Sequence, residues 1–374
     1  MKKRNSKSVI IGLARSIKFN FISRPYYLLK FLVSGTRFCR GVSYYPEKKS
    51  KGFLTIWFEQ LGQTLKYGYP NDLYFSYGFD VKSRSEMKEY MHYAQFSLLR
   101  DKLNMAFPSE SIILRDKFLF GMFAKYLGVA TPENIGISDS DGIFDTRKRT
   151  VVPTAEFLNG LENDDLFVKP FDGECGAGIF HLEVAGKEFK VNGETTDIEN
   201  LTKILESNRY LLQQKVTQNE VMASLHPQSL NTIRLVTVRH RRTGKIDVFP
   251  SILRIGAGKS IVDNTSAGGL AVGIDLSTGK LKEYGLFKPA YGTKTRIHPD
   301  SKIQLSDVTI PYFEECKKQA IRLHSMIPQL HSIGWDIAIG PNGPIFVEGN
   351  DNWEITGPQN CNGGIKKLLL EYSR

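Results

Sequence analysis

The residues from 231 to 276 constrain the fold most, because they place three strand-like segments in succession. The segments are 231–240 (NTIRLVTVRH), 245–256 (KIDVFPSILRIG) and 270–276 (LAVGIDL), with turns at 243–244 and 277–279. Strands that follow one another through short turns pair antiparallel, since a parallel pair needs a crossover of a dozen or more residues. We therefore predict an antiparallel sheet in this part of the chain.

Helices and further strands flank this sheet. In chain order they are a helix over 115–129, strands over 166–171 and 210–216, a helix over 311–330, and a hairpin formed by 334–340 and 344–350. Helices and strands do not alternate regularly, as they would around a parallel sheet. The pattern predicts an α+β fold.

The N-terminal part of the chain carries almost all of the net charge. Residues 1–51 hold 13 of the 50 Lys and Arg but only one of the 39 Asp and Glu, so their net charge is +12, and the remainder is close to neutral at −1. This distribution disfavours nucleic-acid binding, which would need a basic face on the folded domain. No apolar run reaches the roughly 18 residues of a membrane-spanning helix.

Residues 8–34 mix apolar and basic side chains, and Pro25 divides them into two short predicted helices. Such a segment suits the surface of an anionic membrane. The alternative is an ordinary helical layer packed on the main body. Residues 85–104 continue the helical pattern and predict a helical cap. Four widely spaced cysteines indicate a reducing, cytoplasmic location. If the basic segment binds the membrane, the protein would lie peripherally on the inner face of that membrane.

The final hairpin contains the strongest group of functional candidates. Asp336 lies on one strand, and Glu348 and Asn350 share one face of the other, because side chains two apart in a strand point the same way. Two carboxylates and an amide oxygen form the kind of hard-oxygen set that Mg²⁺ prefers. The alternative is a solvated hairpin rim, although acids rarely close a buried apolar run without a partner.

A lysine and a glycine-rich segment form the second group. Lys169 leaves a short apolar strand and is followed by 172–178 (DGECGAG), whose backbone amides are free to approach phosphate oxygens. A plain hairpin is the alternative for this loop. Lys117 lies in the 115–129 helix, where a lone lysine is ordinarily solvated. It becomes a phosphate ligand only if the fold places it beside the other groups.

Two arginines are centred in apolar strands. Arg234 and Arg254 interrupt NTIRLVT and SILRIG, and burying an arginine is costly unless it meets an anion. One interpretation is a buried salt bridge with Asp336 or Glu348. The other is stabilisation of a phosphoryl group during its transfer. The loop 263–269 (DNTSAGG) then follows as a segment suited to contact a substrate or phosphate.

The order of these groups along the chain resembles the ATP-grasp superfamily over roughly residues 112–360. It looks closest to the protein C-terminal glutamate ligases and to the ATP-grasp proteins associated with sugar transfer in bacterial polysaccharide clusters, the second above all. The resemblance implies two α+β subdomains whose antiparallel sheets grip ATP. Together with the charge and helical patterns, it divides the chain into four parts: 1–50, a basic segment suited to a membrane surface; 51–111, helical; 112–212, the first subdomain; and 213–374, the second.

The resemblance also implies roles for individual residues. Lys117, Lys169 and the loop glycines Gly173, Gly176 and Gly178 would bind phosphate, and Gln213, Gln214, Lys215 and Val216 would form the adenine hinge. Glu220, or else Asn231 and Thr232, would hold the ribose. Arg254, Arg234 and Asn264 would act in catalysis, Ser266, Gly268 and Gly269 would contact substrate, and Asp336, Glu348 and Asn350 would hold Mg²⁺. The chain departs from the pattern at Gln213, where glutamate is usual, and after Asn350, where 351–359 (DNWEITGPQ) replaces a proline-glycine pair.

The implied activity is ATP-dependent joining of a carboxylate to an amine through an acyl phosphate. We expect the substrates to be a sugar acid and an amine or amino acid in cell-surface polysaccharide synthesis. One alternative is a peptide or amino-acid ligase. Another is a nucleotide-binding partner of a glycosyltransferase without catalysis. Asp351 and Glu354 are expected either to meet the amine or to be solvated.

Overall fold

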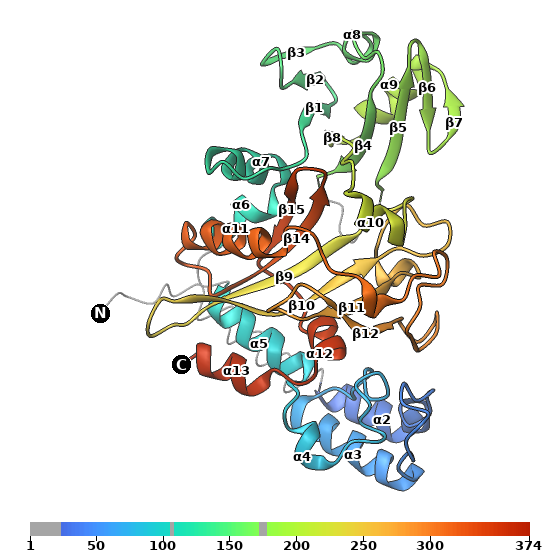
Figure 1. Cartoon of the computed structure of the whole chain (residues 1–374), viewed down its shortest axis with the longest axis vertical. Coiled ribbons are helices and arrows are strands. Elements are labelled where there is room, and N and C mark those ends of the chain that lie inside the picture. Colours follow the sequence, from blue (N-terminus) through green and yellow to red (C-terminus); the bar gives the residue numbers. More distant parts are fainter. Residues whose placement is uncertain (1–23, 105–107, 172–177) are drawn as a thin grey trace.

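The computed structural model describes residues 24–104, 108–171 and 178–374. These residues form three lobes along the long axis of the molecule (Figure 1). A first antiparallel sheet lies at one end, a second one in the middle, and a group of N-terminal helices at the other end. The prediction of an α+β fold with two antiparallel sheets is therefore confirmed.

The first sheet has the strand order β3-β2-β1-β8-β4-β5-β6-β7 within the described residues. Its strands are β1 (Asn134–Asp139), β2 (Gly142–Asp145), β3 (Thr150–Val152), β4 (Asp165–Pro170), β5 (Phe180–Ala185), β6 (Glu188–Val191), β7 (Glu194–Thr196) and β8 (Tyr210–Gln214). Helices α8 (Thr154–Asn159) and α9 (Ile198–Glu206) cover one face, where Leu166, Val168 and Leu212 join their core. Residues at the alternate positions of β4 and β8 face the opposite way.

The second sheet has the order β13-β12-β11-β10-β9-β14-β15 in the part of the chain that is described. Its strands are β9 (Thr232–Arg239), β10 (Ile246–Ile255), β11 (Leu270–Ile274), β12 (Leu281–Leu286), β13 (Lys294–Thr295), β14 (Ser332–Gly340) and β15 (Gly343–Asn350). The three strands predicted over 231–276 are successive neighbours, as expected, and the predicted hairpin is β14 and β15.

Each face of the second sheet has its own helices. Helices α6 (Pro108–Arg115), α7 (Lys117–Tyr126) and α11 (Phe313–Ser325) lie on one face, over a core that includes Ile233, Leu235 and Trp335. Helices α5 (Tyr93–Asn104), α12 (Thr356–Asn362) and α13 (Lys366–Tyr372) cover part of the other face, and α10 (Glu220–Leu225) joins the two sheets. The short 3₁₀ helices η2 (Thr265–Ala267) and η3 (Leu305–Asp307) lie in loops.

Three predicted helices differ from the structure in their bounds, and the one expected over 311–330 is the shorter α11 (Phe313–Ser325). The helix expected over 115–129 begins at Lys117, because the Asp116 carboxylate accepts hydrogen bonds from the amides of Phe118 and Leu119 and so caps α7. The cap expected over 85–104 is two helices, α4 (Arg84–Met87) and α5. Between them the Gln359 side chain binds both backbone groups of Met91, at 2.8 and 2.9 Å, and holds the chain out of helical geometry.

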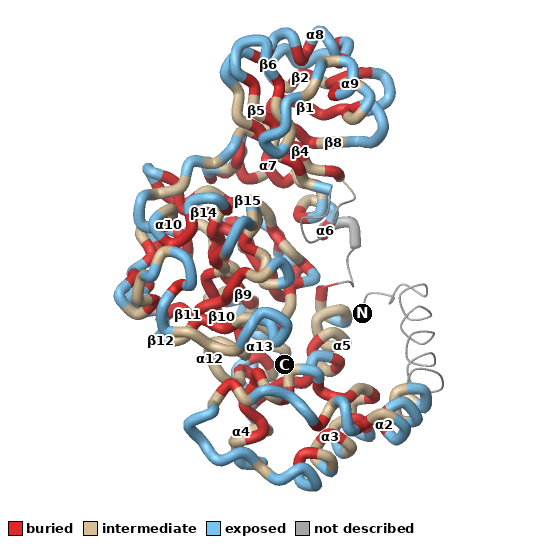
Figure 2. The backbone as a smooth tube through the Cα atoms, turned by 90° about the vertical axis from the view of Figure 1, so that its right-hand side faces the viewer, coloured by how far each residue is buried: buried red, intermediate tan, exposed pale blue. Residues whose placement is uncertain are grey.

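The N-terminal lobe contains α2 (Arg24–Phe38), α3 (Phe53–Tyr67) and α4. Pro25 lies in the first turn of α2, where the missing amide costs no helical hydrogen bond, and the helix predicted before it falls outside the described residues. The tube in Figure 2 shows this lobe with its own buried residues, separate from those of the sheets. None of the described helices is long and apolar enough to cross a bilayer.

Asn104 joins α5 to the second sheet through four hydrogen bonds. Its Oδ1 accepts from the amides of His331 and Ser332, at 3.0 and 3.1 Å, and its Nδ2 donates to the carbonyls of Ser332 and Asp351, both at 2.7 Å. We expect Asn104→Ala to lower the free energy of unfolding by about 3 kcal/mol, because it leaves several buried backbone groups unpaired. Urea denaturation measures this. Asn352→Ala, at an exposed position, is the control and should change stability by less than about 0.5 kcal/mol; equal effects would contradict the account.

Candidate nucleotide and metal site

The charged residues of the second sheet meet on one face of it. Asp336 on β14 is paired directly with Arg234 on β9 and with Glu348 on β15, and Arg254 on β10 is paired with Thr232 on β9. Directly paired residues share a face, and this face is opposite to the one that carries Ile233 and Trp335. The hairpin register predicted from the sequence thus does bring Asp336 and Glu348 together.

Asp336 is the centre of a buried ion-pair network. Its Oδ1 accepts from Arg234 Nε at 2.5 Å, and its Oδ2 accepts from Arg234 Nη2 at 3.0 Å and forms an ion pair with Arg254 Nη2 at 2.9 Å. Arg254 also contacts the Asp263 carboxylate at 3.5 Å and donates to the Thr232 hydroxyl. The salt-bridge interpretation of the two arginines is therefore what the structure contains. A carboxylate has about four lone-pair positions, and besides these contacts Asp336 shares a hydrogen bond with the Glu348 carboxyl group.

Burial and charge act in opposite directions on the two hairpin acids. Burial by itself would raise the pKa of Asp336, but Arg234 and Arg254 outweigh it and hold that pKa well below its usual range. Glu348 has a raised pKa, because it is desolvated and lies beside the charge of Asp336. Its Oε1 accepts from Asn350 Nδ2 at 3.1 Å. Two adjacent carboxylates of which one resists ionisation form a site that a cation would stabilise.

The face of the first sheet away from its helices carries Phe167, Lys169 and Gln213. Phe167 lies directly opposite Gln213 on β8 and is stacked on His181 from β5. Gln213 is buried, and its Nε2 donates to Asn134 Oδ1 at 2.6 Å. Its Oε1 is buried and has no hydrogen-bond partner. A buried unpaired acceptor is costly, and its position is where an exocyclic amino group would satisfy it.

Lys169 connects the two sheets electrostatically. Burial lowers its pKa to about 8, Glu348 on β15 opposes that shift, and Lys117 at the start of α7 adds to it. These three residues come from the first sheet, the second sheet and the helix between them, so the fold brings both predicted phosphate-binding lysines near the predicted metal hairpin. The charged form of a desolvated lysine beside another cation is destabilised, and a bound phosphate would stabilise it.

The glycine-rich loop is described only at its end. Gly173 and Gly176 fall outside the described residues. Gly178 has a φ of +73°, and a Cβ there would lie 3.2 Å from Pro170 Cγ, so the backbone conformation at this position favours glycine.

The remaining hinge residues use much of their hydrogen-bonding capacity within the fold. The amide of Gln214 donates to Glu133 O and that of Lys215 to Asp165 O, both at 2.8 Å. The side chain of Gln214 binds Asp164, and that of Lys215 binds Asp165. Val216 is half-buried just beyond the end of β8.

The three predicted ribose ligands lie in different surroundings. Glu220 is exposed in the first turn of α10. Asn231 is fully buried, and its Nδ2 donates hydrogen bonds to the Gln218 side chain and to the carbonyls of Met222 and His226. Thr232 binds Asp263 through both its amide and its hydroxyl. Of the three, Glu220 is the one exposed to solvent.

The loop after β10 contains a residue that the sequence analysis did not single out. Asp263 is buried, and its pKa is raised by burial against the opposing pull of Arg254. Asn264 caps η2, Ser266 is exposed, and Gly268 has a φ of +95°. A Cβ at Gly269 would lie 2.8 Å from the carbonyls of Asp263 and Ile255, so only glycine fits there. The signal for Asp263 was an acid at the start of the glycine-containing loop that follows the strand with Arg254.

Of the two acids after the hairpin, Asp351 does not lie as expected, whereas the Glu354 side chain is 46% exposed. Asp351 is buried and forms a two-pronged ion pair with Arg115, at 3.0 and 2.8 Å, so it is neither solvated nor available to an amine. Arg115 ends α6, directly before the α7 cap, and the pair therefore fixes α7 against the hairpin. Glu354 lies 3.7 Å from Arg100, and burial raises its pKa.

The comparisons with known proteins agree with this geometry. Residues 99–371 match the sugar-transfer associated ATP-grasp family, and the chain belongs to it. The class that the family defines is thus the ATP-grasp proteins, in a branch associated with sugar transfer. No curated protein matches the sequence.

Several solved structures share the fold at low sequence identity. N5-carboxyaminoimidazole ribonucleotide synthetase in complex with ADP is 10% identical, with a TM-score of 0.38 over 65% of this chain and 46% of its own. D-alanine–D-alanine ligase from Bacillus anthracis, complexed with ATP, is 12% identical, with a TM-score of 0.34 over 71% and 62%. The ATP-grasp ligase PsnB, complexed with a precursor, Mg and ADP, is 12% identical, with a TM-score of 0.38 over 78% and 69%. The chain spans less than two thirds of the length of the first two.

The lowered pKa of Lys169 gives a prediction about its reactivity. Only the neutral amine reacts with acetic anhydride, so labelling of Lys169 should rise with pH about a midpoint near 8 rather than near the ordinary value of 10.5. The same shift affects stability. Between pH 8 and 10.5, Lys169 is protonated in the unfolded chain but largely neutral in the folded one, so its contribution to the free energy of unfolding increases as pH rises through that window. Pulsed acetylation followed by peptide mass spectrometry measures the midpoint. A midpoint near 10.5 would contradict the proposed burial.

Proposed function

We propose that this protein is an ATP-dependent carboxylate–amine ligase whose nucleotide lies between the two sheets. The observation that carries the proposal is the electrostatic interaction of Lys169 with both Glu348 and Lys117, which brings a cation of the first sheet and a cation of α7 near a carboxylate of the second sheet. Triphosphate and Mg²⁺ need such a pairing of charges. Membership of the ATP-grasp family supports the same assignment.

The residues present fit ATP and magnesium on two further grounds. The unpaired Oε1 of Gln213 suits the exocyclic amino group of adenine, and it replaces the usual glutamate as an acceptor without adding a charge. Asp336 and Glu348 lie in hydrogen-bond contact, and Glu348, whose pKa is raised, gains most from a cation. We assign these two carboxylates and the Asn350 amide oxygen to Mg²⁺, and Glu220 to the ribose. Bound magnesium would supply neutralisation of phosphate charge.

The proposed chemistry needs no side-chain nucleophile. A substrate carboxylate oxygen attacks the γ-phosphorus of ATP, and the bond to the β–γ bridging oxygen breaks, giving an acyl phosphate and ADP. An amine then attacks the acyl carbon, and inorganic phosphate leaves as the amide forms and the amine loses a proton. Lys169 and Arg254 hold the transferring phosphoryl oxygens, while Arg234 keeps Asp336 ionised and in place.

For the substrates we propose a sugar acid and an amine or amino acid. The sugar-transfer association of the family supports this choice. A peptide or amino-acid ligase is the second candidate, and it requires only a different acceptor at the same site. A nucleotide-binding partner without catalysis is the third. It would not need Arg254 and Arg234 beside the metal carboxylates.

A substrate panel separates these candidates. The protein is incubated with MgATP, uronic acids and amino acids, and ADP and condensation products are measured by coupled assay and mass spectrometry. We expect ADP together with an amide of a uronic acid. Dipeptides alone would indicate the second candidate. ATP binding by calorimetry without ADP from any mixture would contradict the ligase proposal.

The matched variants in this assay are Glu348→Gln and Glu371→Gln. The first removes a metal carboxylate without changing size, and we expect at least a hundredfold loss of ADP formation, about 2.7 kcal/mol or more in the barrier. The second lies exposed on α13 and should behave as wild type. Full turnover in Glu348→Gln would show that the metal assignment is wrong.

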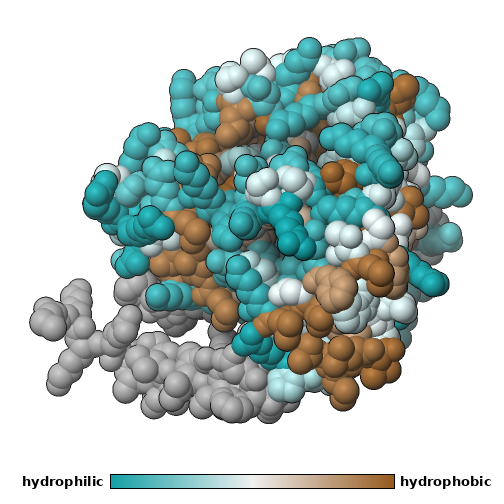
Figure 3. Space-filling view, turned by 90° about the horizontal axis from the view of Figure 1, so that it is seen from below, coloured by the Kyte–Doolittle hydropathy of each residue, from teal (hydrophilic) through white to brown (hydrophobic). Residues whose placement is uncertain are grey.

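We also propose that α2 places the protein on an anionic membrane surface. Leu29, Leu32 and Val33 are 63%, 58% and 80% exposed on this helix, beside Lys30. Hydrophobic residues gather on the face of the molecule seen from below, the end at which the N-terminal lobe lies (Figure 3). The charge of +12 in residues 1–51 adds electrostatic attraction to this apolar area.

Vesicle sedimentation tests the membrane proposal. Leu29→Asp with Val33→Asp should reduce binding to phosphatidylserine vesicles at least fivefold, because it removes apolar insertion and adds negative charge. Leu98→Asp with Ile112→Asp is the control, since these residues are 57% and 58% exposed but lie outside the N-terminal lobe. A similar loss in both double variants, or none in the first, would contradict the proposal.

A further inference from the structure

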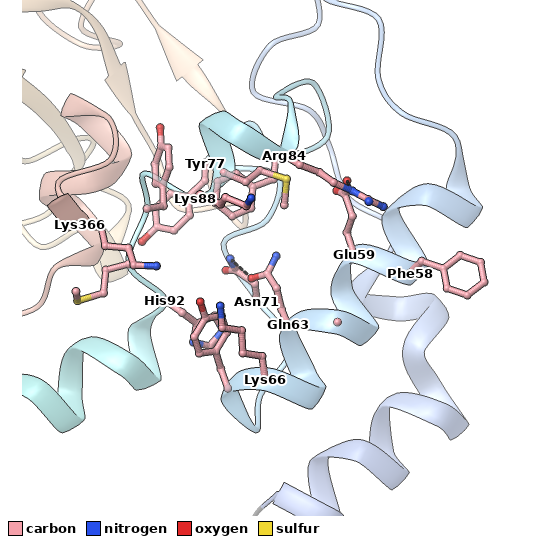
Figure 4. Close-up of a pocket in the computed structure, with 16 residues that line it drawn as sticks. Phe58, Glu59, Gln63, Lys66, Asn71, Tyr77, Arg84, Lys88, His92 and Lys366 are labelled. Carbon is pink, nitrogen blue, oxygen red and sulfur yellow. Dashed lines mark hydrogen bonds and ion pairs between the residues drawn. The ribbon is translucent and has the colours of Figure 1, made fainter.

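A cavity lies in the N-terminal lobe, away from the candidate nucleotide site. It has a volume of about 350 Å³ and is bounded by α3, by the segment from Tyr77 to His92, and by Lys366 at the start of α13 (Figure 4). The lobe lies at the opposite end of the molecule from the first sheet, which carries Lys169 (Figure 1). Nearly all of its lining precedes the residues matched by the family. The nucleotide site and this cavity are therefore separate.

A glycine within α3 leaves one side of the cavity open. Gly62 lies inside the helix Phe53–Tyr67, where glycine costs helix stability relative to alanine. A Cβ at Gly62 would meet nothing within 4 Å, so neither packing nor a positive φ requires a glycine there. A side chain at this position would occupy the cavity instead. The absence of one keeps the space accessible.

The lining of the cavity is cationic. Lys66 from α3, Lys88 after α4 and Lys366 from α13 surround it (Figure 4). Within the described residues, none of these three lysines is paired with a carboxylate. Glu59 is an acid of the lining, but it is already held by Lys51 at 2.9 Å and by the Tyr74 hydroxyl at 2.5 Å. These unpaired ammonium groups would be stabilised by a bound anion, and lysine commonly binds phosphate.

The interior of the cavity combines apolar walls with an unpaired donor. Tyr77, Phe79 and Tyr90 supply aromatic surface. Gln63 uses its Oε1 to accept from Asn71 Nδ2 at 3.0 Å, but its Nε2 is buried without a partner. A buried N–H₂ group without an acceptor is costly, and a ligand oxygen would satisfy it. The ligand therefore needs both an acceptor oxygen and an apolar part.

The cavity is also connected to the second sheet. His92, stacked on Tyr67 at 4.5 Å between ring centroids, follows Met91, whose backbone is bound on both sides by Gln359 of α12. Helix α12 packs against β10, the strand that carries Arg254. A ligand in the cavity would thus brace the N-terminal lobe against the sheet of the candidate site.

We propose that this cavity binds a phosphate ester that carries an apolar group. The lysines and the Gln63 amide bind the phosphate oxygens, and the aromatic walls contact the apolar part. Two sources of this chemistry exist, a compact aryl ester and an alkyl ester of the kind found in a lipid. The binding does not depend on ligase activity.

Calorimetry on the full chain tests the proposal with octyl phosphate below its micelle concentration, phenyl phosphate, inorganic phosphate and octanol. We expect one of the two esters to bind at least tenfold more tightly than inorganic phosphate and octanol. Tighter binding of octyl phosphate points to the lipid-type source, and tighter binding of phenyl phosphate to the aryl source. Saturable binding of neither ester would overturn the proposal.

Matched variants locate the binding. Gly62→Trp fills the cavity and Lys366→Gln removes a cation, and each should weaken ester binding at least tenfold. Gly62→Ala and Lys367→Gln, the latter on the exposed neighbour in α13, should bind as wild type. Lys169→Met should also bind as wild type, and a loss there would assign the ester to the nucleotide site and overturn the proposal. If Gly62→Trp does not fold by circular dichroism, Lys366→Gln decides, and its binding as tightly as wild type would overturn the proposal.

Discussion

The ion-pair network around Asp336 is the interaction on which the rest of the structure depends. The Asp336 carboxylate on β14 accepts two hydrogen bonds from Arg234 on β9 and forms an ion pair with Arg254 on β10, and Glu348 lies beside it on β15. The network therefore joins the four adjacent strands β10, β9, β14 and β15 of the second sheet. Buried ion pairs often contribute little to stability, because desolvation offsets the attraction. A network of this kind in the middle of a sheet is better explained by a binding role, because it holds ionised side chains in position for a ligand.

The rest of the fold brings complementary charge to this network. Lys169 faces it from the first sheet, and the Arg115–Asp351 ion pair together with the Asp116 cap fixes the start of α7, where Lys117 lies. On the opposite side, Asn104 and Gln359 join the N-terminal helices to the second sheet through buried hydrogen bonds. In the Asp116, Asn104 and Gln359 contacts, side-chain groups satisfy backbone polar atoms.

The sequence predicted the local elements of this fold well, because their signals are local. Apolar alternation and tight turns indicated β9, β10 and β11 and the β14–β15 hairpin, and its register followed from the short turn. Helix bounds were less accurate where a side chain from elsewhere intervened, as Gln359 does at Met91. The resemblance to the ATP-grasp superfamily supplied the relation between the two sheets, which no local pattern contains.

The sequence indicated the candidate residues of the site, but not which residues each of them contacts. Arg234 and Arg254 were recognised as anomalous in apolar strands, yet the choice between a salt bridge and a phosphate ligand depends on where Asp336 lies in three dimensions. Arg115 was missed because its partner is distant in the sequence, and Asp263 because the sequence does not show that its loop returns to Thr232 and Arg254. Asp351 was expected to meet the amine or to be solvated, because nothing in the sequence pairs it with Arg115, more than 200 residues away. The cavity at Gly62 is likewise formed by segments that only the fold brings together.

The most direct test of the account is a crystal structure of the full chain with Mg²⁺ and a non-hydrolysable ATP analogue. The account predicts that the metal is bound by oxygens of Asp336 and Glu348, that the phosphates contact Lys169 and Arg254, and that adenine donates its amino group to Gln213 Oε1. A nucleotide bound elsewhere, or one bound between the sheets with no metal at Asp336 and Glu348, would contradict it.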